Sequence, residues 1–194
     1  MREVQVLGVG MTAFGKFLDR GLKALGGEAM SAALADAGVA ADELQAAFVG
    51  NAMAGLITGQ ECIRGQVILR ALGLGGLPVY NMENACASAS TAFHTAWMAV
   101  AGGMYDVALA LGVEKLKDED KKKSFTALGS AVDVEAAAAF ARDLNRDRGA
   151  DAAEGAGERR SVFMDFYASE AREHMARYGT RRVLSSAGGR RCGT

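Results

Sequence analysis

The sequence has 194 residues, half of them hydrophobic (50%), which suffices for one domain with a core or for part of a larger one. Its 22 basic and 23 acidic residues give a net charge of −1, which excludes the positive field that nucleic-acid binding requires. No apolar run reaches the roughly 18–20 residues of a membrane span, and the N-terminus lacks a signal-peptide pattern. Three widely spaced cysteines predict neither a disulfide framework nor a metal site. We therefore expect a soluble, cytoplasmic protein.

Strand-like and helix-like segments alternate over the first 115 residues. Apolar runs predict buried strands at 4–10, 44–50, 77–82 and 106–113. Amphipathic spacing predicts helices at 22–37, 61–72 and from Cys86 to the Gly102–Gly103 pair, with 51–59 as a loop or short extended piece. The last of these helices should bury a face made of Ala89, Phe93, Ala96, Trp97 and Val100. Alternation of this kind predicts the α/β class, with helices on both faces of a parallel or mixed sheet.

The character of the chain changes after residue 115. A charge run at 115–123 is typical of a solvated loop, and an Ala-rich stretch at 133–145 predicts a helix. Residues 146–160 are charged and glycine-containing, which predicts a mobile segment. A final amphipathic helix is expected at 161–178.

Cys86 is the candidate nucleophile. It follows the expected strand at 77–82 and stands where the next helix begins, near the positive end of the helix dipole. Such a position favours the thiolate, which is the nucleophilic form of cysteine. A buried structural cysteine is the alternative, because free cysteines are among the most buried residues.

The other titratable candidates predict no partner for this thiol. His94 lies eight residues further along the same expected helix, about 12 Å away, which is too far for a direct pair. We therefore predict structural roles for His94 and His174, packing for Cys62, and a disordered tail thiol for Cys192. The backbone N–H of Cys86 can supply one donor to an oxyanion.

Two sequence blocks resemble the thiolases, and more narrowly the sterol-carrier-protein type. The first is Asn-Ala-Cys-Ala-Ser-Ala-Ser at 84–90, and the second is Ala-Gly-Gly-Met-Tyr-Asp-Val-Ala-Leu-Ala-Leu-Gly-Val-Glu-Lys at 101–115. Residues 6–12, 49–51 and 167–180 are similar to that group as well, so the resemblance covers about residues 3–180. A condensing ketosynthase shares the cysteine, but Gly-Val-Glu-Lys at 112–115 fits thiolases better.

The resemblance implies a layered αβαβα fold and an acyltransferase activity. Cys86 would be acylated by an acyl-CoA during thiolytic cleavage of a 3-ketoacyl-CoA or the reverse condensation, with coenzyme A as a substrate and no permanently bound cofactor or metal. Residues 1–115 would form the core, and 116–180 a loop subdomain that covers the substrate. The strand at 77–82 would pair across a homodimer interface. Lipid metabolism is the implied setting.

This chain departs from the thiolase pattern in its second part. A complete thiolase has a similarly folded second half whose Gly-His-Pro, Asn-Glu-Ala-Phe and Cys-x-Gly-Gly-Gly motifs supply the activating histidine, an oxyanion contribution and an acid/base cysteine. None of these occurs here, and residues 181–194 form a divergent tail that we expect to be disordered. We expect a truncated or frame-shifted product. The alternative function is a catalytically incomplete fragment, or a non-catalytic subunit that binds a second thiolase-half chain.

Overall fold

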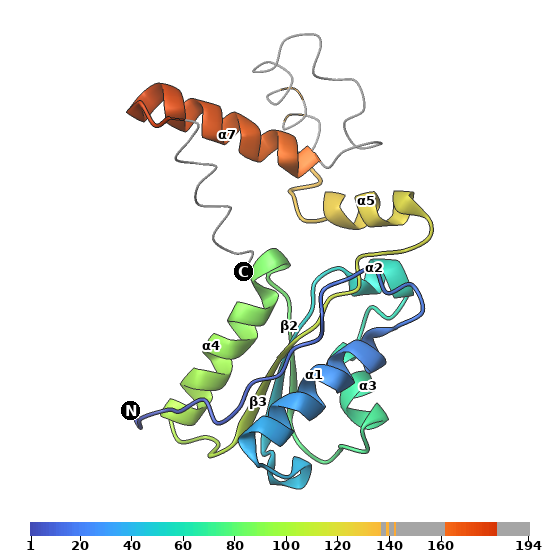
Figure 1. Cartoon of the computed structure of the whole chain (residues 1–194), viewed down its shortest axis with the longest axis vertical. Coiled ribbons are helices and arrows are strands. Elements are labelled where there is room, and N and C mark those ends of the chain that lie inside the picture. Colours follow the sequence, from blue (N-terminus) through green and yellow to red (C-terminus); the bar gives the residue numbers. More distant parts are fainter. Residues whose placement is uncertain (137–138, 140–141, 143–161, 182–194) are drawn as a thin grey trace. The chain divides into compact units, whose positions relative to one another are not determined.

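The computed structural model describes residues 1–136, 139, 142 and 162–181, which fall into two units, Met1–Ala127 and Leu128–Thr194. The first unit contains the sheet and the helices that cover it (Figure 1). The predicted mobile segment at 146–160, nearly all of the predicted tail at 181–194 and most of the predicted helix at 133–145 lie outside the described residues.

The sheet has three parallel strands, β1 (Ala46–Gly50), β2 (Val79–Met82) and β3 (Ala108–Gly112), in the order β2-β1-β3. Gly50, the last residue of β1, lies opposite Met82 of β2 and Gly112 of β3. All three carboxyl ends therefore meet at one edge of the sheet. In open α/β sheets this edge is where ligands bind. The predicted α/β class is confirmed.

Helices cover both faces of this sheet. Helices α1 (Leu22–Ala37) and α3 (Arg64–Ala71) pack on one face, and α4 (Ser88–Ala101) packs on the other (Figure 1). The first face buries an apolar cluster that includes Met30, Ile68, Leu69, Val49, Leu109 and Leu111. The second buries Phe48 and Ala46 against alanines of α4. Because β1 is covered on both faces, every one of its residues is buried.

Several predicted elements match closely. Helix α1 has the predicted bounds, and Gly38 ends it with a left-handed φ of 64° while its N–H donates to the carbonyls of the last turn. Helix α3 is shorter than predicted, because Ile63 adopts a positive φ of 52° just before it. The remaining elements are the short turns η1 (Ala41–Glu43) and η2 (Ala85–Ala87) and the helices α2 (Ala54–Thr58), α5 (Lys121–Gly129) and α7 (Val162–Tyr178). Helix α7 agrees with the predicted 161–178.

The loop predicted at 51–59 is wrong, since it contains α2. Thr58 donates from Oγ1 to the carbonyl of Ala54 (2.7 Å), and Gly59, with φ of 79°, ends the helix. The prediction of a solvated loop at 115–123 is also wrong, both at the start and at the end of this range. Lys115 is buried, and α5 begins at Lys121. None of the helices within the described residues is long and apolar enough to cross a membrane.

The buried strand predicted at 4–10 is wrong as well. These residues have no regular structure, and Val6, Leu7 and Val9 are exposed. Gly8 and Gly10 lie directly on α1, where a Cβ on either residue would collide with the helix backbone. The segment therefore rests on a helix, and no backbone hydrogen bond joins it to a strand of the described sheet.

Candidate active site at the carboxyl ends of the strands

Cys86 lies in η2, between the end of β2 and the start of α4, and its thiol is exposed. The sequence reading that made it a buried structural cysteine is therefore wrong. Helix α4 runs for 14 residues from Ser88, so its partial positive charge is directed at this turn. An exposed thiol at a helix N-terminus has the placement of a nucleophile.

The turn that presents Cys86 is tightly bonded. Ala85 has a positive φ of 44°, which is unusual for a residue with a side chain, and its N–H donates to Oε1 of Glu83 (2.6 Å). The side chain of Ser88 makes two hydrogen bonds within the turn. Its Oγ accepts from the N–H of Asn84 (2.9 Å) and donates to the carbonyl of Ala85 (2.8 Å). These bonds hold the backbone of residues 83–88 in one conformation.

One donor of the turn remains available. The N–H of Ala87 is used by the carbonyl of Asn84 (2.8 Å), whereas the N–H of Cys86 has no acceptor within the described part of the chain. A free backbone N–H beside the nucleophile can donate to an oxygen that gains negative charge. The arrangement thus agrees with the donor expected from the sequence.

Glycines at the strand ends set the position of α4. A Cβ on Gly50 would collide with the backbone of Ser88, and a Cβ on Gly112 would collide with the Cβ of Ala89. The first turn of α4 therefore lies directly on the ends of β1 and β3. This close approach fixes Cys86 over the carboxyl edge of the sheet.

Cys86 lines a cavity of about 600 Å³ at this edge. The walls come from residues 10–17, the ends of β1 and β3, the turn at Cys86, and residues 113–117. Apolar atoms dominate the lining, and the polar side chains in it are those of Thr12, Asn51, Ser88, Glu114, Lys115 and Lys117. A largely apolar hollow with a few polar groups beside a nucleophile is typical of a small-molecule site.

The buried Asn51 and the exposed Glu114 form a polar network that the sequence analysis did not assign. The Nδ2 of Asn51 donates to the carbonyl of Val113 (2.6 Å) and to Oε1 of Glu114 (3.2 Å). The other carboxylate oxygen, Oε2, accepts the N–H groups of Ala52 (3.0 Å) and Met53 (3.1 Å). Asn51 is only 3% exposed, and its Oδ1 has no hydrogen-bond partner among the described residues. The signal for these residues was their place just after two neighbouring parallel strands, since Asn51 follows Gly50 of β1 and Glu114 lies two residues beyond Gly112 of β3.

Lys115 connects the cavity to the N-terminal segment. Its side chain is only 9% exposed, and its Nζ donates to the carbonyls of Phe17 and Arg20 (2.6 Å to the latter). A buried ammonium group needs such acceptors. Lys115 therefore fastens the segment that forms one wall of the cavity.

The other candidates lie elsewhere. His94 is on α4 with its ring beside Trp97 (6.2 Å between centroids), and it does not line the cavity. His174 belongs to α7, where its Nδ1 pairs with Oγ1 of Thr180 (3.2 Å). The packing role predicted for Cys62 is wrong because this residue is exposed. Cys192 is outside the described residues, and the part of the chain that is described contains no cluster of His, Cys, Asp and Glu able to hold a metal ion.

Comparison with known proteins decides the family. Residues 4–147 match the family described as "Thiolase, N-terminal domain". The chain belongs to the thiolase family. The match includes Cys86, both glycines beneath α4, and the Asn51–Glu114 network.

Three curated relatives illustrate the range of this family. An acetyl-CoA acetyltransferase of Methanothermobacter thermautotrophicus is 37% identical over 182 residues, which are 94% of this chain and 42% of the relative. Sterol carrier protein 2 of Gallus gallus is 32% identical over 92% of this chain and 30% of the relative. The benzoylsuccinyl-CoA thiolase subunit BbsB of Thauera aromatica is 37% identical over 58% of this chain and 28% of the relative. This thiolase-family chain thus spans less than half the length of these curated relatives.

Proposed function

We propose that this chain carries the nucleophile of a thiolase-type acyltransferase, and that Cys86 is the residue that is acylated. The observation that carries the proposal is the exposed Cys86 thiol at the head of α4, opening into a 600 Å³ cavity with its own N–H unpaired. The relatives' names supply the substrate class, because they include acetyl-CoA acetyltransferases.

The proposed step is transfer of an acyl group from coenzyme A to Cys86. The thiolate of Cys86 attacks the thioester carbonyl, and the carbonyl oxygen becomes an oxyanion that accepts the Cys86 N–H. When the oxyanion collapses, the bond from the carbonyl carbon to the coenzyme A sulfur breaks. Coenzyme A leaves as a thiolate that takes up a proton, and the acyl group remains on Cys86 as a thioester.

Proton transfer is where this site is incomplete. No histidine, cysteine or carboxylic acid is positioned as a base beside Cys86 within the described residues, since the Glu114 carboxylate is occupied by backbone and side-chain donors. A general base contributes about 10²–10⁴-fold to rate. We therefore propose slow acylation by this chain alone, with a second polypeptide supplying the base in the complete enzyme.

A second candidate function is a non-catalytic thiolase subunit that binds a partner chain. It is favoured by one relative's description as a thiolase subunit. We also propose that a homodimer forms through the outer edge of β2, which has no neighbouring strand in the described sheet. Sedimentation of the purified chain tests this, and a monomer at all concentrations would contradict it.

The two functions are separated by covalent labelling. Incubation with radiolabelled acetyl-CoA should attach label to the wild-type chain and to Cys62→Ala, which removes the other exposed thiol of the described residues, but not to Cys86→Ala. Label that persists in Cys86→Ala would contradict the assignment of the nucleophile. Absence of label from the wild-type chain would favour the non-catalytic subunit.

A further inference from the structure

Asn51 connects the ends of all three strands and lines the cavity of Cys86. It follows β1 directly, and its backbone N–H donates to the carbonyl of Met82 at the end of β2 (3.1 Å). Its side-chain Nδ2 donates to the carbonyl of Val113, the residue after β3 (2.6 Å). The same cavity is lined by Asn51 and by the nucleophile. An amide side chain is thus held at the carboxyl edge of the sheet, within the candidate active site.

The two ends of the Asn51 amide differ in their hydrogen bonding. Nδ2 has two acceptors, because it also donates to Oε1 of Glu114 (3.2 Å). A reversed amide would set an oxygen against a carbonyl and a carboxylate, so these acceptors fix its orientation. Oδ1 has no hydrogen-bond partner among the described residues, although Asn51 is only 3% exposed. Since buried polar atoms nearly always have a partner, Oδ1 is an acceptor that a bound molecule can use.

The donors that surround Asn51 in this network are already used. The N–H groups of Ala52 and Met53 donate to Oε2 of Glu114 (3.0 and 3.1 Å). The N–H of Lys115 donates to Oε1 of the same carboxylate (3.1 Å), and its ammonium group donates to two carbonyls of the N-terminal segment. A molecule in the cavity that carries an N–H or O–H group would supply the missing donor. Because an unpaired buried acceptor costs free energy, such a donor would strengthen binding.

Coenzyme A carries one such donor close to the reacting atoms. Two CH₂ groups follow the thioester sulfur and an amide comes next, so the amide nitrogen is four bonds from the carbonyl carbon that Cys86 would attack. In acetyl-CoA this amide N–H is the donor nearest to that carbon, because the acetyl group has none. A thioester placed for attack by Cys86 therefore brings this N–H into the cavity that Asn51 lines. Hydroxylated acyl groups are a second source of the same donor chemistry.

We propose that Asn51 determines specificity in the acyl-transfer site by accepting, at Oδ1, the N–H of the coenzyme A amide nearest to the sulfur. The torsion at the end of an asparagine side chain is soft, so Oδ1 can turn toward the donor while Nδ2 keeps its acceptors. A site with a buried acceptor rejects a ligand that lacks the donor, because the acceptor then stays unpaired. The inference rests on the proposed function, since it concerns the substrate of that same site.

Two small thioesters that differ in one group test the proposal on the full chain. S-Acetyl-N-acetylcysteamine carries the amide N–H of coenzyme A, and the matching S,O-diacetyl-2-mercaptoethanol has an ester oxygen in its place. Each rate of acetylation of Cys86 is divided by the rate of the same compound with free cysteine, which removes intrinsic differences in reactivity. We expect the corrected rate to be at least about tenfold higher for the amide than for the ester in the wild-type chain.

Substitutions of Asn51 show whether Oδ1 causes this preference. Asn51→Leu removes the acceptor at similar side-chain volume, and its amide-to-ester ratio should fall to within about twofold of one. A general loss of stability or of thiol reactivity cancels, because both rates come from the same variant. Thr12→Val is the matched control, since it removes another polar group of the cavity lining, and it should keep the wild-type ratio. Asn51→Ala repeats the test if Asn51→Leu fails to fold.

Binding is measured without acyl transfer through the protection of Cys86 from iodoacetamide. The probes are the S-ethyl thioethers of the same amide and ester, which cannot acylate a thiol. We expect the amide to protect the wild-type chain at about one tenth of the ester concentration or less, and both to protect Asn51→Leu equally. Acetylation with no preference for the amide would overturn this inference and leave the proposed function standing. Amide-selective protection without acetylation would do the reverse.

Four results would overturn the proposal. They are equal rates and equal protection for the amide and the ester in the wild-type chain, a preference that survives in Asn51→Leu, loss of the preference in Thr12→Val, and absence of both acetylation and protection. A thioester of 3-hydroxybutyrate that lacks the amide tests the other donor. If its hydroxyl raises the corrected rate over that of the butyrate thioester, and the amide gives no advantage, Oδ1 serves the acyl chain and the proposal is overturned.

Discussion

At the scale of single residues, Cys86 depends on glycines that lie outside its own turn. Gly50 and Gly112 let the first turn of α4 rest on the strand ends, and Ser88 then bonds the turn that presents the thiol. From the residues themselves, a reactive cysteine was indicated by its place before a helix, and the resemblance to thiolases added its expected role. The contact of both glycines with α4 depends on register across three strands, which one sequence does not reveal.

Gly50→Ala tests this dependence. The added Cβ would meet the backbone of Ser88, which cannot rotate away as a side chain can, so we expect a loss of about 1–3 kcal/mol in the free energy of unfolding. Urea unfolding measures it. Gly75→Ala is the control, because nothing lies within 4 Å of a Cβ there, and its effect should stay within about 1 kcal/mol. Equal stability of Gly50→Ala and the wild type would contradict the close approach.

Lys115→Met tests the attachment of the N-terminal segment. The substitution keeps an apolar stem but leaves the carbonyls of Phe17 and Arg20 without their donor, so unfolding should become easier by about 1–3 kcal/mol. Limited proteolysis should cut the segment at 10–20 faster. Lys121→Met, at an exposed lysine, should change neither measurement. A Lys115→Met chain as stable as the control would show that these bonds do not hold the segment.

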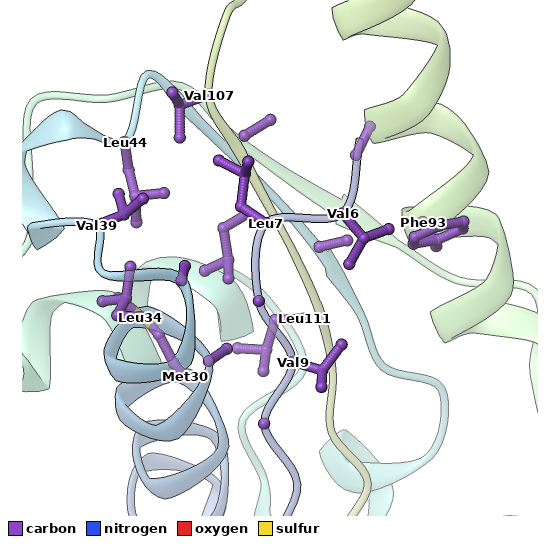
Figure 2. Close-up of a pocket in the computed structure, with 18 of the residues that line it drawn as sticks. Val6, Leu7, Val9, Met30, Leu34, Val39, Leu44, Phe93, Val107 and Leu111 are labelled. Carbon is purple, nitrogen blue, oxygen red and sulfur yellow. The ribbon is translucent and has the colours of Figure 1, made fainter. Parts of the chain in front are cut away.

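At the scale of elements, the segment before α1 differs most from the structure that its sequence predicts. Its apolar residues predicted a strand, yet no described strand pairs with it. Residues 4–10 line a hollow beside α1 and α4 (Figure 2), yet Val6, Leu7 and Val9 remain exposed. The prediction of a buried strand is therefore wrong in burial as well as in hydrogen bonding.

The anchor of this segment at Arg2 predicts a pH dependence. The hydrogen bond from Arg2, its charge, and a hydrogen bond from Gln45 hold the pKa of Asp106 below its ordinary value. A lowered pKa in the folded chain means that the ionised carboxylate stabilises the fold above the ordinary pKa of about 3.9, and that this contribution is lost as pH falls through the folded value. We expect the melting temperature of Asp106→Asn to lie below that of the wild type at pH 5–7.

That difference should shrink as pH falls below about 4, because the wild-type carboxyl then becomes neutral. Thermal melts of both chains from pH 7 to pH 2 measure it. Asp19→Asn, an exposed position, is the control and should follow the wild type at every pH. A difference in melting temperature between the wild type and Asp106→Asn that stays constant down to pH 2 would contradict the role of the ion pair.

The sheet and its covering helices were predictable from sequence because their signals are local. Apolar runs, helical spacing and the Gly38 cap each depend on neighbouring residues. The place of Asn51 and Glu114 after two strands was visible in the sequence, but the hydrogen bond between them was not predictable, since it joins residues 63 positions apart. Helix α2 was missed because glycines on both sides suggested a loop, although Thr58 and Gly59 close one short turn of helix.

At the scale of the whole molecule, the proposed function leaves proton transfer to be supplied. Within the described residues, the cavity has a nucleophile and a backbone donor, and no base lies beside the thiol. Co-expression with the part of the Methanothermobacter relative that lies outside the match should therefore raise acyl transfer by at least about tenfold over the chain alone. The same co-expression with Cys86→Ala should give no transfer. An unchanged rate with the wild-type chain would contradict a site completed by a second polypeptide.

The central claim is that Cys86 is the acylated residue of this thiolase-family chain. The most direct measurement is peptide mapping by mass spectrometry after incubation of the wild-type chain with acetyl-CoA. The account predicts a single acetyl group on the peptide that contains Cys86, released by hydroxylamine as a thioester is, with Cys62 unmodified. An acetyl group on Cys62 or on lysines, with none on Cys86, would contradict it.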